Sequence, residues 1–374
     1  MKIAIDASRA FLNQRTGIEE YAFETIKNLR KNLKCQEVVL YLRIGGKKRL
    51  EESIDLPSGW VAKEISFKYF WTQIGMAWEF LTNPPDVLFI PAHTVPWIHP
   101  QNTVVTVHGL EYEHCPESYS LYSRLFHRFF IRKSCLWARK IIAVSHNTKK
   151  DLIERYGVPE EKIKVVYNGF NSPVAAPKEQ KKENVKKNGE KKDNYFLYIG
   201  RLEKRKNIEG IIKAFEIAKK EKGYKGKLLL AGKPGYGYED IKKAVVESEY
   251  CQDITELGYI EQERKWQLLE EADVFLFPSL CEGFGLPILE AQTSSVPVVT
   301  SNFGPMDEVV NNSDLLADPL SPEEIANLAV KLTENKVFRQ KVIKKGRENI
   351  ENFSWASCGK ETASVLVKNA GKDI

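Results

Sequence analysis

Short apolar runs alternate with amphipathic stretches along most of the chain. In its first part the runs lie at residues 1–7, 38–43, 86–91, 103–109, 140–146 and 163–169. Such short runs, apolar at nearly every position, are typical of strands buried on both faces of a parallel sheet. Helical patterns lie between them, as at residues 17–31, where apolar residues share one face. The alternation therefore predicts an α/β domain with a doubly wound sheet over residues 1–170.

The alternation is interrupted at residues 171–194, a segment with seven Lys/Arg, four Asp/Glu and no aromatic residue. We interpret this segment as a charged linker. Beyond it, apolar runs predict strands at residues 195–201, 227–233, 254–260, 273–279 and 296–301. Helices are expected at about 207–222, 261–272, 286–294, 305–311 and 322–350. A second doubly wound domain thus extends over residues 195–354, and the cleft between two such domains is the expected ligand site.

Composition removes several classes of protein from consideration. The chain has 374 residues, enough for two domains, of which 43% are hydrophobic and 28% charged, as in soluble globular proteins. No apolar run approaches the roughly 18 residues of a membrane-spanning helix. Residues 1–11 contain Asp6 and no apolar core, unlike a signal peptide. The six cysteines form no C-x-x-C pair, so we expect reduced thiols in a cytosolic protein.

The stretch LCEGFGLPILE at residues 280–290 follows a predicted strand and opens a predicted helix. Gly283 and Gly285 allow a ligand to approach the backbone closely, and N–H groups at the helix start attract an anion. The carboxylates of Glu282 and Glu290 would repel a bare phosphate, but each accepts hydrogen bonds from neighbouring hydroxyls. A phosphate between two diols describes a nucleotide sugar, with its ribose, diphosphate and hexose.

Two basic residues supply the charge that a diphosphate needs. Arg201 ends the predicted strand 195–201, and Lys206 follows it before a predicted helix. Considered alone, this segment is more typical of a solvated basic loop at a helix start. The acidic motif elsewhere in the same domain makes phosphate binding the better interpretation.

Taken together, the motifs resemble those of the retaining glycosyltransferases of family 4. The resemblance covers nearly the whole chain and rests on the pair Glu282 and Glu290 with GFGLP between them, and on GRLEKRKN (200–207), LGYI (257–260) and the segments 108–120, 144–169 and 353–361. It implies a GT-B fold, in which two Rossmann-like domains face a central cleft and a C-terminal helix, at about residues 355–374, crosses back to the first domain. Residues 1–170 would then bind the acceptor and residues 195–354 the nucleotide sugar.

The resemblance also assigns roles to the residues of the second domain. Glu282 would contact the donor hexose and Glu290 the ribose, while Arg201 and Lys206 would hold the diphosphate. The backbone that completes the phosphate cradle would come from Gly283, Phe284, Gly285 and Leu286. The backbone that meets the base would come from Gly258, Tyr259 and Ile260.

The first domain contributes Gly17 and His108 to the expected site. Gly17 would let a helix N-terminus face the β-phosphate, although an ordinary turn glycine remains an alternative. His108 ends the strand predicted at 103–109, and the resemblance places it beside the anomeric centre as a positioning and charge-stabilising residue. A strand-end histidine that caps a loop is the alternative. Glu111 is a weaker candidate for acceptor contact.

The expected catalytic set is therefore His108, Glu282, Arg201 and Lys206, with no protein nucleophile. The chain contains no D-x-D triplet, so we expect neither a divalent cation nor another cofactor. The resemblance favours mannose transfer from GDP-mannose to a glycan or polyprenyl-linked acceptor in surface polysaccharide biosynthesis. A UDP-, ADP- or dTDP-sugar, and a non-catalytic nucleotide-sugar-binding protein, are the alternatives. A dehydrogenase or epimerase is disfavoured because G-x-G-x-x-G does not follow the first strand.

Charge is distributed unevenly along the chain. Residues 118–150 contain eight Lys/Arg and no acid, and Arg124, Arg128 and Arg132 recur every four residues. This stripe is a candidate contact with an anionic membrane surface, consistent with a peripheral protein at the cytoplasmic face. The alternative is a core-packed helix with a solvated basic face. The aromatic segment 67–80 is expected to pack within its domain, with a membrane contact as the alternative. No nucleic-acid-binding motif accompanies the basic residues.

Overall fold

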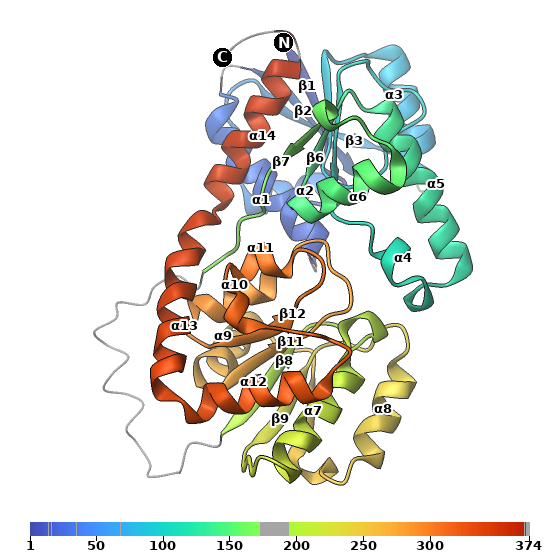
Figure 1. Ribbon diagram of the computed structural model, residues 1–374. Helices are drawn as coiled ribbons and strands as arrows, with labels where there is room; N and C mark the ends of the chain where they lie inside the picture. The colour runs from blue at the N-terminus through green and yellow to red at the C-terminus, as the bar shows by residue number, and fades with distance from the viewer. Residues whose placement is uncertain are drawn as a thin grey trace. The chain divides into compact units, whose positions relative to one another are not determined.

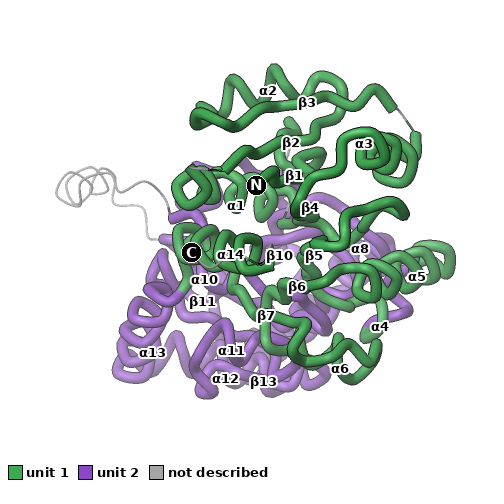
Figure 2. The backbone as a smooth tube through the Cα atoms, turned by 90° about the horizontal axis from the view of Figure 1, so that it is seen from above, with its two compact units in different colours: residues 1–114, 120–169, 353–374 green, residues 115–119, 170–352 purple. Residues whose placement is uncertain are grey.

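The computed structural model describes all residues except 14, 16, 35, 68, 173–193, 370 and 372–374, so most of the linker expected at 171–194 lies outside the described residues. The chain forms two compact units (Figures 1 and 2). Unit 1 comprises residues 1–114, 120–169 and 353–374, and unit 2 comprises residues 115–119 and 170–352. Each unit contains one parallel sheet with helices around it.

Unit 1 contains a seven-stranded sheet in the order β3-β2-β1-β4-β5-β6-β7, in which every neighbouring pair is parallel. Its strands are β1 (Lys2–Asp6), β2 (Glu37–Arg43), β3 (Trp60–Ile65), β4 (Val87–Ile90), β5 (Thr103–Val107), β6 (Lys140–Ala143) and β7 (Ile163–Val165). Six of these were predicted from apolar runs. The edge strand β3 was not, because its solvent side carries polar residues and the run is broken.

The helices of unit 1 are α1 (Gly17–Asn32), α2 (Gly46–Ser53), the π-helical η1 (Trp71–Met76), α3 (Ala77–Thr82), α4 (Glu111–His114), α5 (Leu121–Trp137), α6 (His146–Tyr156) and α14 (Trp355–Asn369), with a 3₁₀ turn η3 (Glu160–Lys162). The predicted return of the C-terminal helix to the first domain is confirmed, because α14 packs along α1. Gly359 of α14 permits this close approach: a Cβ there would lie 2.6 Å from the Cβ of Asn28.

Unit 2 contains a six-stranded parallel sheet in the order β10-β9-β8-β11-β12-β13. Its strands are β8 (Tyr195–Ile199), β9 (Lys227–Ala231), β10 (Ile254–Gly258), β11 (Val274–Phe277), β12 (Val298–Ser301) and β13 (Leu316–Ala317). Chain order runs outward in opposite directions from β8 and from β11. These two neighbours therefore form the switch point where ligands of doubly wound sheets bind.

The helices of unit 2 are α7 (Ile208–Lys220), α8 (Tyr238–Glu247), α9 (Gln262–Glu271), α10 (Leu286–Thr293), α11 (Met306–Val310), α12 (Pro322–Glu334) and α13 (Lys336–Asn349), with 3₁₀ turns η2 (Pro116–Ser118), η4 (Lys204–Lys206), η5 (Cys251–Asp253), η6 (Ser313–Leu315) and η7 (Ile350–Asn352). The prediction of a single helix over residues 322–350 was wrong. Asn335 is extended, and its side chain accepts a hydrogen bond from Phe338 N at 2.9 Å, which starts α13 afresh. Helix α8 was missed because Ile241 is its one buried residue.

Among the described residues, no helix combines the length and apolar character needed to cross a membrane. The described cysteines form no disulfide: Cys115, Cys135, Cys251, Cys281 and Cys358.

Candidate active site

The loops that follow β8 and β11 are locked together at the switch point of unit 2. The backbone N–H of Leu280 donates to the Arg205 carbonyl at 2.9 Å. Asn207 adopts a left-handed conformation (φ 59°), and its side-chain amide donates to the carbonyls of Pro278 (3.1 Å) and Pro319 (2.7 Å). These bonds hold residues 203–207 against residues 278–282.

Glu282 lies at the centre of a charged cluster within this pair of loops. Its carboxylate accepts a hydrogen bond from Lys206 Nζ and another from Arg205 Nη1 at 3.3 Å. Arg205 in turn contacts Glu203 at 2.7 Å between Nη2 and Oε1. The Glu282 side chain is only 10% exposed. The structure thus brings together two residues of the expected catalytic set, Glu282 and Lys206, from different strand ends.

The charges around Glu282 keep it ionised. Burial would raise the pKa of the Glu282 carboxyl, but the positive charges of Lys206 and Arg205 outweigh burial and lower it. Burial and the neighbouring Arg205 lower the pKa of Lys206, against the opposing effect of Glu282. An ionised, largely buried carboxylate is a strong acceptor for ligand hydroxyls.

Glu290 is held in a separate pair on the next helix. Its Oε1 lies 2.7 Å from Nζ of Lys265 on α9, and both side chains are largely buried. Gly285, with φ 108°, precedes the helix, where a Cβ would lie 3.2 Å from Met306 Cε. Helix α10 begins at Leu286, whose backbone N–H has no intrahelical acceptor, whereas Pro287 has no N–H and Ile288 N donates to the Gly285 carbonyl at 3.0 Å. Anion binding by residues 283–286 stays a prediction, for which the Leu286 N–H at this helix start is the candidate donor.

The other residues of unit 2 that were expected at the donor site lie at the ends of β8 and β10, between which β9 runs. Arg201 is exposed just beyond β8, and its carbonyl accepts a hydrogen bond from Tyr198 Oη at 2.9 Å. Gly258 ends β10 with φ 64°, and its carbonyl accepts from Gly232 N at 2.7 Å. Tyr259 follows as an exposed ring with Lys233 Nζ 4.5 Å from its centroid, and Ile260 is half-buried beside it.

His108 lies in unit 1, directly after β5. Its Nε2 is 2.7 Å from the Pro91 carbonyl, which can only accept, so Nε2 carries the proton. Its ring makes edge contacts with Tyr21 (4.6 Å between centroids) and His93 (5.0 Å). Burial lowers the pKa of His108 to about 4. A neutral ring cannot supply positive charge at neutral pH, so the charge-stabilising role expected for His108 lacks support and a positioning role remains.

Gly17 is the first residue of α1, as expected of a helix N-terminus near an anion. A Cβ at this position would meet no atom within 4 Å. The packing of unit 1 therefore does not by itself require glycine there.

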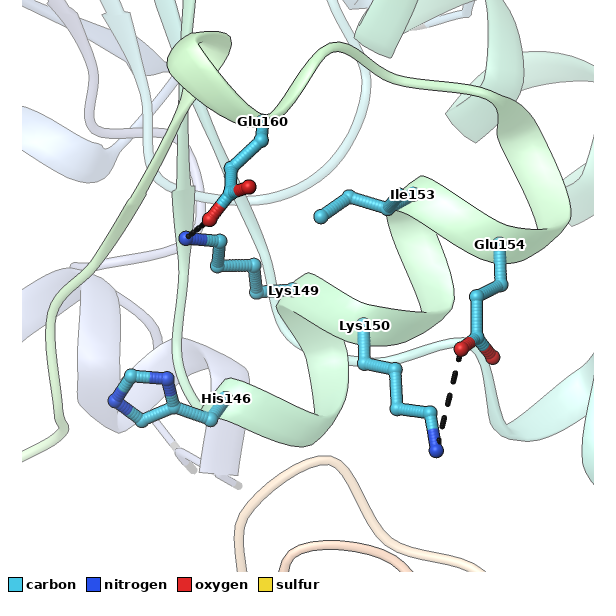
Figure 3. Close-up of a pocket in the computed structure, with 6 residues that line it drawn as sticks. All are labelled: His146, Lys149, Lys150, Ile153, Glu154 and Glu160. Atoms are coloured by element: carbon cyan, nitrogen blue, oxygen red, sulfur yellow. Dashed lines mark hydrogen bonds and ion pairs between the residues drawn. The ribbon is translucent and has the colours of Figure 1, made fainter.

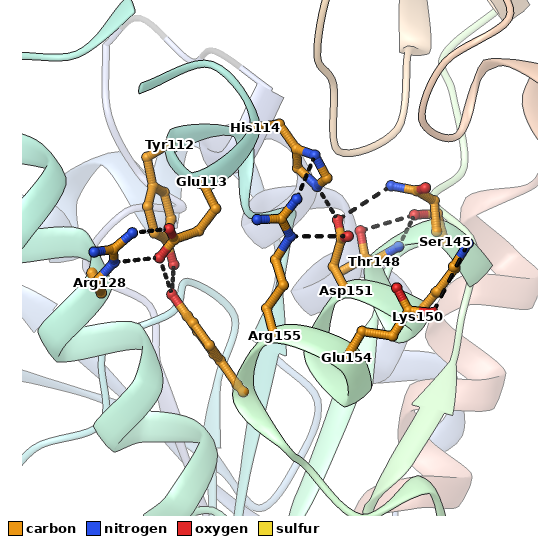
Figure 4. Close-up of polar contacts among 12 residues, drawn as sticks. Tyr112, Glu113, His114, Arg128, Ser145, Thr148, Lys150, Asp151, Glu154 and Arg155 are labelled. Carbon is orange, nitrogen blue, oxygen red and sulfur yellow. Dashed lines mark hydrogen bonds and ion pairs between the residues drawn. The ribbon is translucent and has the colours of Figure 1, made fainter. Parts of the chain in front are cut away.

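A polar network fixes the segment that follows His108 (Figure 4). Glu113 of α4 is bound by Arg128 of α5, with Nε 2.7 Å from Oε1, and by the Tyr156 hydroxyl at 3.1 Å. The hydrogen bond from Arg128 keeps the pKa of Glu113 low. His114 Nε2 contacts Asp151 Oδ2 at 2.7 Å on α6. Helix α4, with Glu111 at its start, is thereby anchored to two longer helices.

Sequence reasoning missed two cations of the site, Arg205 and Lys265. Arg205 lies within the quoted motif GRLEKRKN, where its neighbours Arg201 and Lys206 were chosen instead. Lys265 carries no local signal, because a lysine in the first turns of an amphipathic helix is usually solvated. Its role becomes visible only when α9 packs beside α10.

Two surface hollows lie away from these residues. One, of about 300 Å³ in unit 1, follows α6 and the turn after it, and is drawn in Figure 3 with Lys149 paired to Glu160 at 2.7 Å. The other, of about 440 Å³, lies between α7 and α8 of unit 2. Neither includes a residue of the expected catalytic or donor set, and both are lined mainly by charged side chains that solvent reaches.

Two family models match the chain. The model described as "Glycosyl transferases group 1" matches residues 180–349, and the model "Glycosyltransferase Family 4" matches residues 15–172. The first match contains the Glu282 cluster, and the second contains Gly17, His108 and the Glu113 network.

Curated relatives and solved structures agree with these matches. O-antigen chain mannosyltransferase B of Escherichia coli is 29% identical over 71% of this chain and 70% of its own. O-antigen chain mannosyltransferase RfbU of Salmonella typhimurium is 29% identical over 61% of this chain and 59% of its own. Sucrose-phosphate synthase of Thermosynechococcus elongatus superposes with a TM-score of 0.73 at 19% identity, covering 98% of both chains. WaaG, a glycosyltransferase involved in lipopolysaccharide biosynthesis, gives 0.68 at 15% identity, covering 97% and 99%.

The structural likenesses, at such low identity, establish the fold, and the family models establish the kind of enzyme. The chain belongs to the family 4 glycosyltransferases, which adopt the GT-B fold.

Proposed function

We propose that this glycosyltransferase moves mannose from GDP-mannose to a glycan or polyprenyl-linked acceptor in surface polysaccharide biosynthesis. The relatives named as O-antigen mannosyltransferases support the choice of sugar and pathway class. The observation that carries the proposal is the Glu282 cluster at the switch point of unit 2, next to the helix start that Glu290 follows. We also propose that the reaction occurs at the cytoplasmic face of the membrane.

In this proposal each group of the donor has a partner. Hydroxyls of the hexose donate to the ionised Glu282, and the ribose hydroxyls donate to Glu290. The diphosphate accepts from the backbone N–H of Leu286 at the start of α10 and from Lys206 and Arg201. Lys206 then stands between a carboxylate and a phosphate and holds both in place.

The chemistry follows from charge placement. The bond between the anomeric carbon and the β-phosphate oxygen breaks, and a bond to the acceptor oxygen forms. The acceptor attacks from the face that the phosphate leaves, and the departing phosphate takes the acceptor proton. The anomeric configuration is therefore retained without a protein nucleophile. Cationic groups stabilise the negative charge that develops on the diphosphate, a contribution typically among the largest in such reactions. We propose that this stabilisation needs no divalent metal.

A thermal-shift panel tests the donor site. A ligand that binds only the folded protein raises its melting temperature. At a ligand concentration one hundred times the Kd, the free energy of unfolding increases by about 2.7 kcal/mol. GDP and GDP-mannose are expected to raise the Tm, with EDTA present or absent, and UDP, ADP and dTDP compounds to raise it less. The shift should disappear in Glu290→Ala and persist in Glu334→Ala, an exposed carboxylate of the same unit.

Other outcomes would redirect the proposal. A larger shift with another nucleotide would replace GDP, and a shift that requires a metal would overturn metal independence. No shift with any nucleotide would overturn the donor site itself. Proton NMR of the product then reports the anomeric configuration, and an inverted product would contradict retention.

A further inference from the structure

Helix α5 directs its apolar side outward. Its exposed positions recur every three or four residues, which defines one helical face. That face is occupied by large apolar side chains between 45% and 78% exposed: Leu121, Tyr122, Leu125, Phe126, Phe129 and Leu136. The expected solvent-facing stripe of Arg124, Arg128 and Arg132 is corrected here. Arg124 and Arg128 are half-buried, Arg128 is bound to Glu113, and Arg132 alone of the three lies on the exposed face.

A second apolar element continues this surface. Trp71, Met76 and Phe80 of the segment 67–82 are buried, as expected of a segment that packs within its domain. Its other side, however, is open to solvent, contrary to that expectation, and Trp78 is 64% exposed. Helices α3 and α5 lie on the same side of unit 1 in both views (Figures 1 and 2). The exposed apolar residues outside α5 are Phe67, Tyr69, Phe70, Ile74, Trp78 and Leu81, with Trp97 and Ile98 on the intervening loop.

Hydrogen bonds join these three segments into one rigid surface. Gln73 of η1 donates to the Val95 carbonyl at 3.3 Å and accepts from Trp97 N at 3.0 Å. Val95 N donates to Ser134 Oγ of α5 at 2.9 Å. The loop that carries Trp97 and Ile98 is therefore fixed between η1 and α5. An apolar surface of this extent is unusual for a monomeric soluble protein and marks a contact with another phase or molecule.

The charges and residue types of this exposed surface indicate which partner binds it. The surface combines Trp and Tyr rings with basic side chains, Arg132 and Lys133 on α5 among them, and residues 118–150 contain no acid. Aromatic rings with cations around them match the boundary between headgroups and acyl chains of an anionic bilayer. A second copy of this chain would instead place its like charges opposite these cations.

We infer that the face formed by α5, the loop at Trp97–Ile98 and the η1–α3 segment docks unit 1 on an anionic lipid surface, with its aromatic side chains inserted at the interface. The docking itself does not depend on the proposed mannose transfer. The idea that this docking brings the enzyme to a lipid-linked acceptor does rest on the proposed function. Insertion of apolar side chains distinguishes this docking from adsorption by basic residues alone, because salt screens only the charges.

Vesicle flotation tests the inference without any turnover, so its failure is distinct from failure of the donor site. The protein is expected to float with phosphatidylglycerol vesicles and weakly with phosphatidylcholine vesicles, and to retain part of its binding at about 0.5 M salt. The double variant Leu125→Ser/Phe129→Ser should lose binding at least about tenfold, because two large apolar side chains no longer insert. The control Leu320→Ser/Val337→Ser changes two apolar residues of unit 2 that are more exposed than Leu125 and Phe129, and it should float as the unchanged protein does.

Three results would overturn the inference. They are no flotation with anionic vesicles, equal flotation of the α5 variant, and complete loss of binding in salt, which would leave only adsorption by charge. Size-exclusion chromatography adds a fourth: a dimer that Leu125→Ser/Phe129→Ser dissociates would assign the face to a second copy. Circular dichroism of each variant confirms that these exposed substitutions leave the fold intact.

Discussion

Each glutamate of the candidate donor site is held by a lysine from a different element. Lys206 binds Glu282 across the two loops at the switch point, and Lys265 of α9 binds Glu290 of α10. A carboxylate that is already oriented loses little freedom when a sugar hydroxyl binds, so these pairs pre-organise the site. The same pairs also connect donor binding with the stability of unit 2.

A double-mutant cycle measures the first of these pairs. Lys206→Met leaves Glu282 buried with Arg205 as its remaining cation and should lower the free energy of unfolding by about 2 kcal/mol, below the usual cost of breaking a buried pair. Glu282→Gln should restore part of the loss, with a coupling energy of at least about 1 kcal/mol by urea unfolding. Additive effects of the two substitutions would show that the pair is not coupled.

His108 should make stability depend on pH. Its pKa of about 4 in the fold lies below the roughly 6.5 of an unfolded histidine. A depressed pKa contributes stability that is fully present above about pH 6.5 and is lost as the pH falls toward 4. The contribution lost by pH 5 is about 2 kcal/mol.

The variant His108→Asn removes that titration. Its melting temperature should fall less steeply than that of the unchanged protein between pH 7 and pH 5. Parallel curves for the two proteins would contradict the neutral, buried state of His108.

At this scale the sequence predicted residue types better than partners. Glu282, Glu290 and Lys206 were recognisable because glycines and a strand end surround them. Arg205 and Lys265 were not, because their significance depends on loops and helices that meet only in the folded sheet. Arg128 was predicted as part of a basic stripe that contacts an anionic membrane, and the fold pairs it with Glu113, a residue fifteen positions away.

Among the elements, α4 depends most on its neighbours. It has four residues, too few to be stable alone, and Arg128 and Tyr156 hold its Glu113 in place. Because α4 follows His108 and begins at Glu111, its position sets where an acceptor would meet unit 1. This dependence makes Glu113 a positioning residue that need not contact substrate.

Glu113→Gln is expected to loosen α4 without affecting the donor site. Under the proposed function, the KM for the acceptor should rise about tenfold, since small misplacements of binding groups are costly. The thermal shift with GDP should be unchanged, and amide exchange should quicken at residues 108–114. Glu154→Gln, which removes an exposed carboxylate 4.0 Å from Lys150, is the matched control. An unchanged KM together with unchanged exchange would contradict the positioning role.

The contact between α1 and α14 depends on a missing side chain. A Cβ at Gly359 would approach Asn28 to 2.6 Å at its Cβ and 3.0 Å at its backbone carbon. Gly359→Ala gains about 1 kcal/mol of helix propensity but should lose more through overpacking, which typically costs 1–3 kcal/mol. Net destabilisation is therefore expected in thermal unfolding, and Lys360→Ala on the exposed side should change little. A stabilised Gly359→Ala would show that the helices separate easily.

The elements that the sequence failed to predict share a physical cause. Strand β3 and helix α8 bury only part of one face, so their apolar pattern is weak. The break between α12 and α13 depends on one capping side chain, Asn335, within an otherwise continuous helical pattern. Buried parallel strands gave the strongest signals, because both of their faces are apolar.

For the molecule as a whole, the order of apolar runs predicted two doubly wound sheets, and the structure contains both. The stretch that contains α5 was predicted as a candidate membrane contact, with a core-packed helix as the alternative. The choice could not be made from the sequence, because a periodic pattern identifies an apolar face but not whether the fold covers it. The division of labour between the units, acceptor in one and donor in the other, remains a proposal. The thermal-shift panel of nucleotides tests donor binding by unit 2. The KM of Glu113→Gln for the acceptor tests acceptor binding by unit 1.

Helix α14 belongs to unit 1 but is synthesised after all of unit 2. Synthesis of the chain therefore sets the order in which the two units can complete their folding. A ribosome completes residues 1–169 first, but the roughly 180 residues up to 352 must follow before α14 emerges. At about 5–20 residues per second, the nascent chain exposes the uncovered side of α1 for about 10–40 seconds. Unit 2 therefore has time to fold before unit 1 is complete. A product released early would carry a finished unit 2 beside an open first unit, a natural substrate for chaperones and proteases.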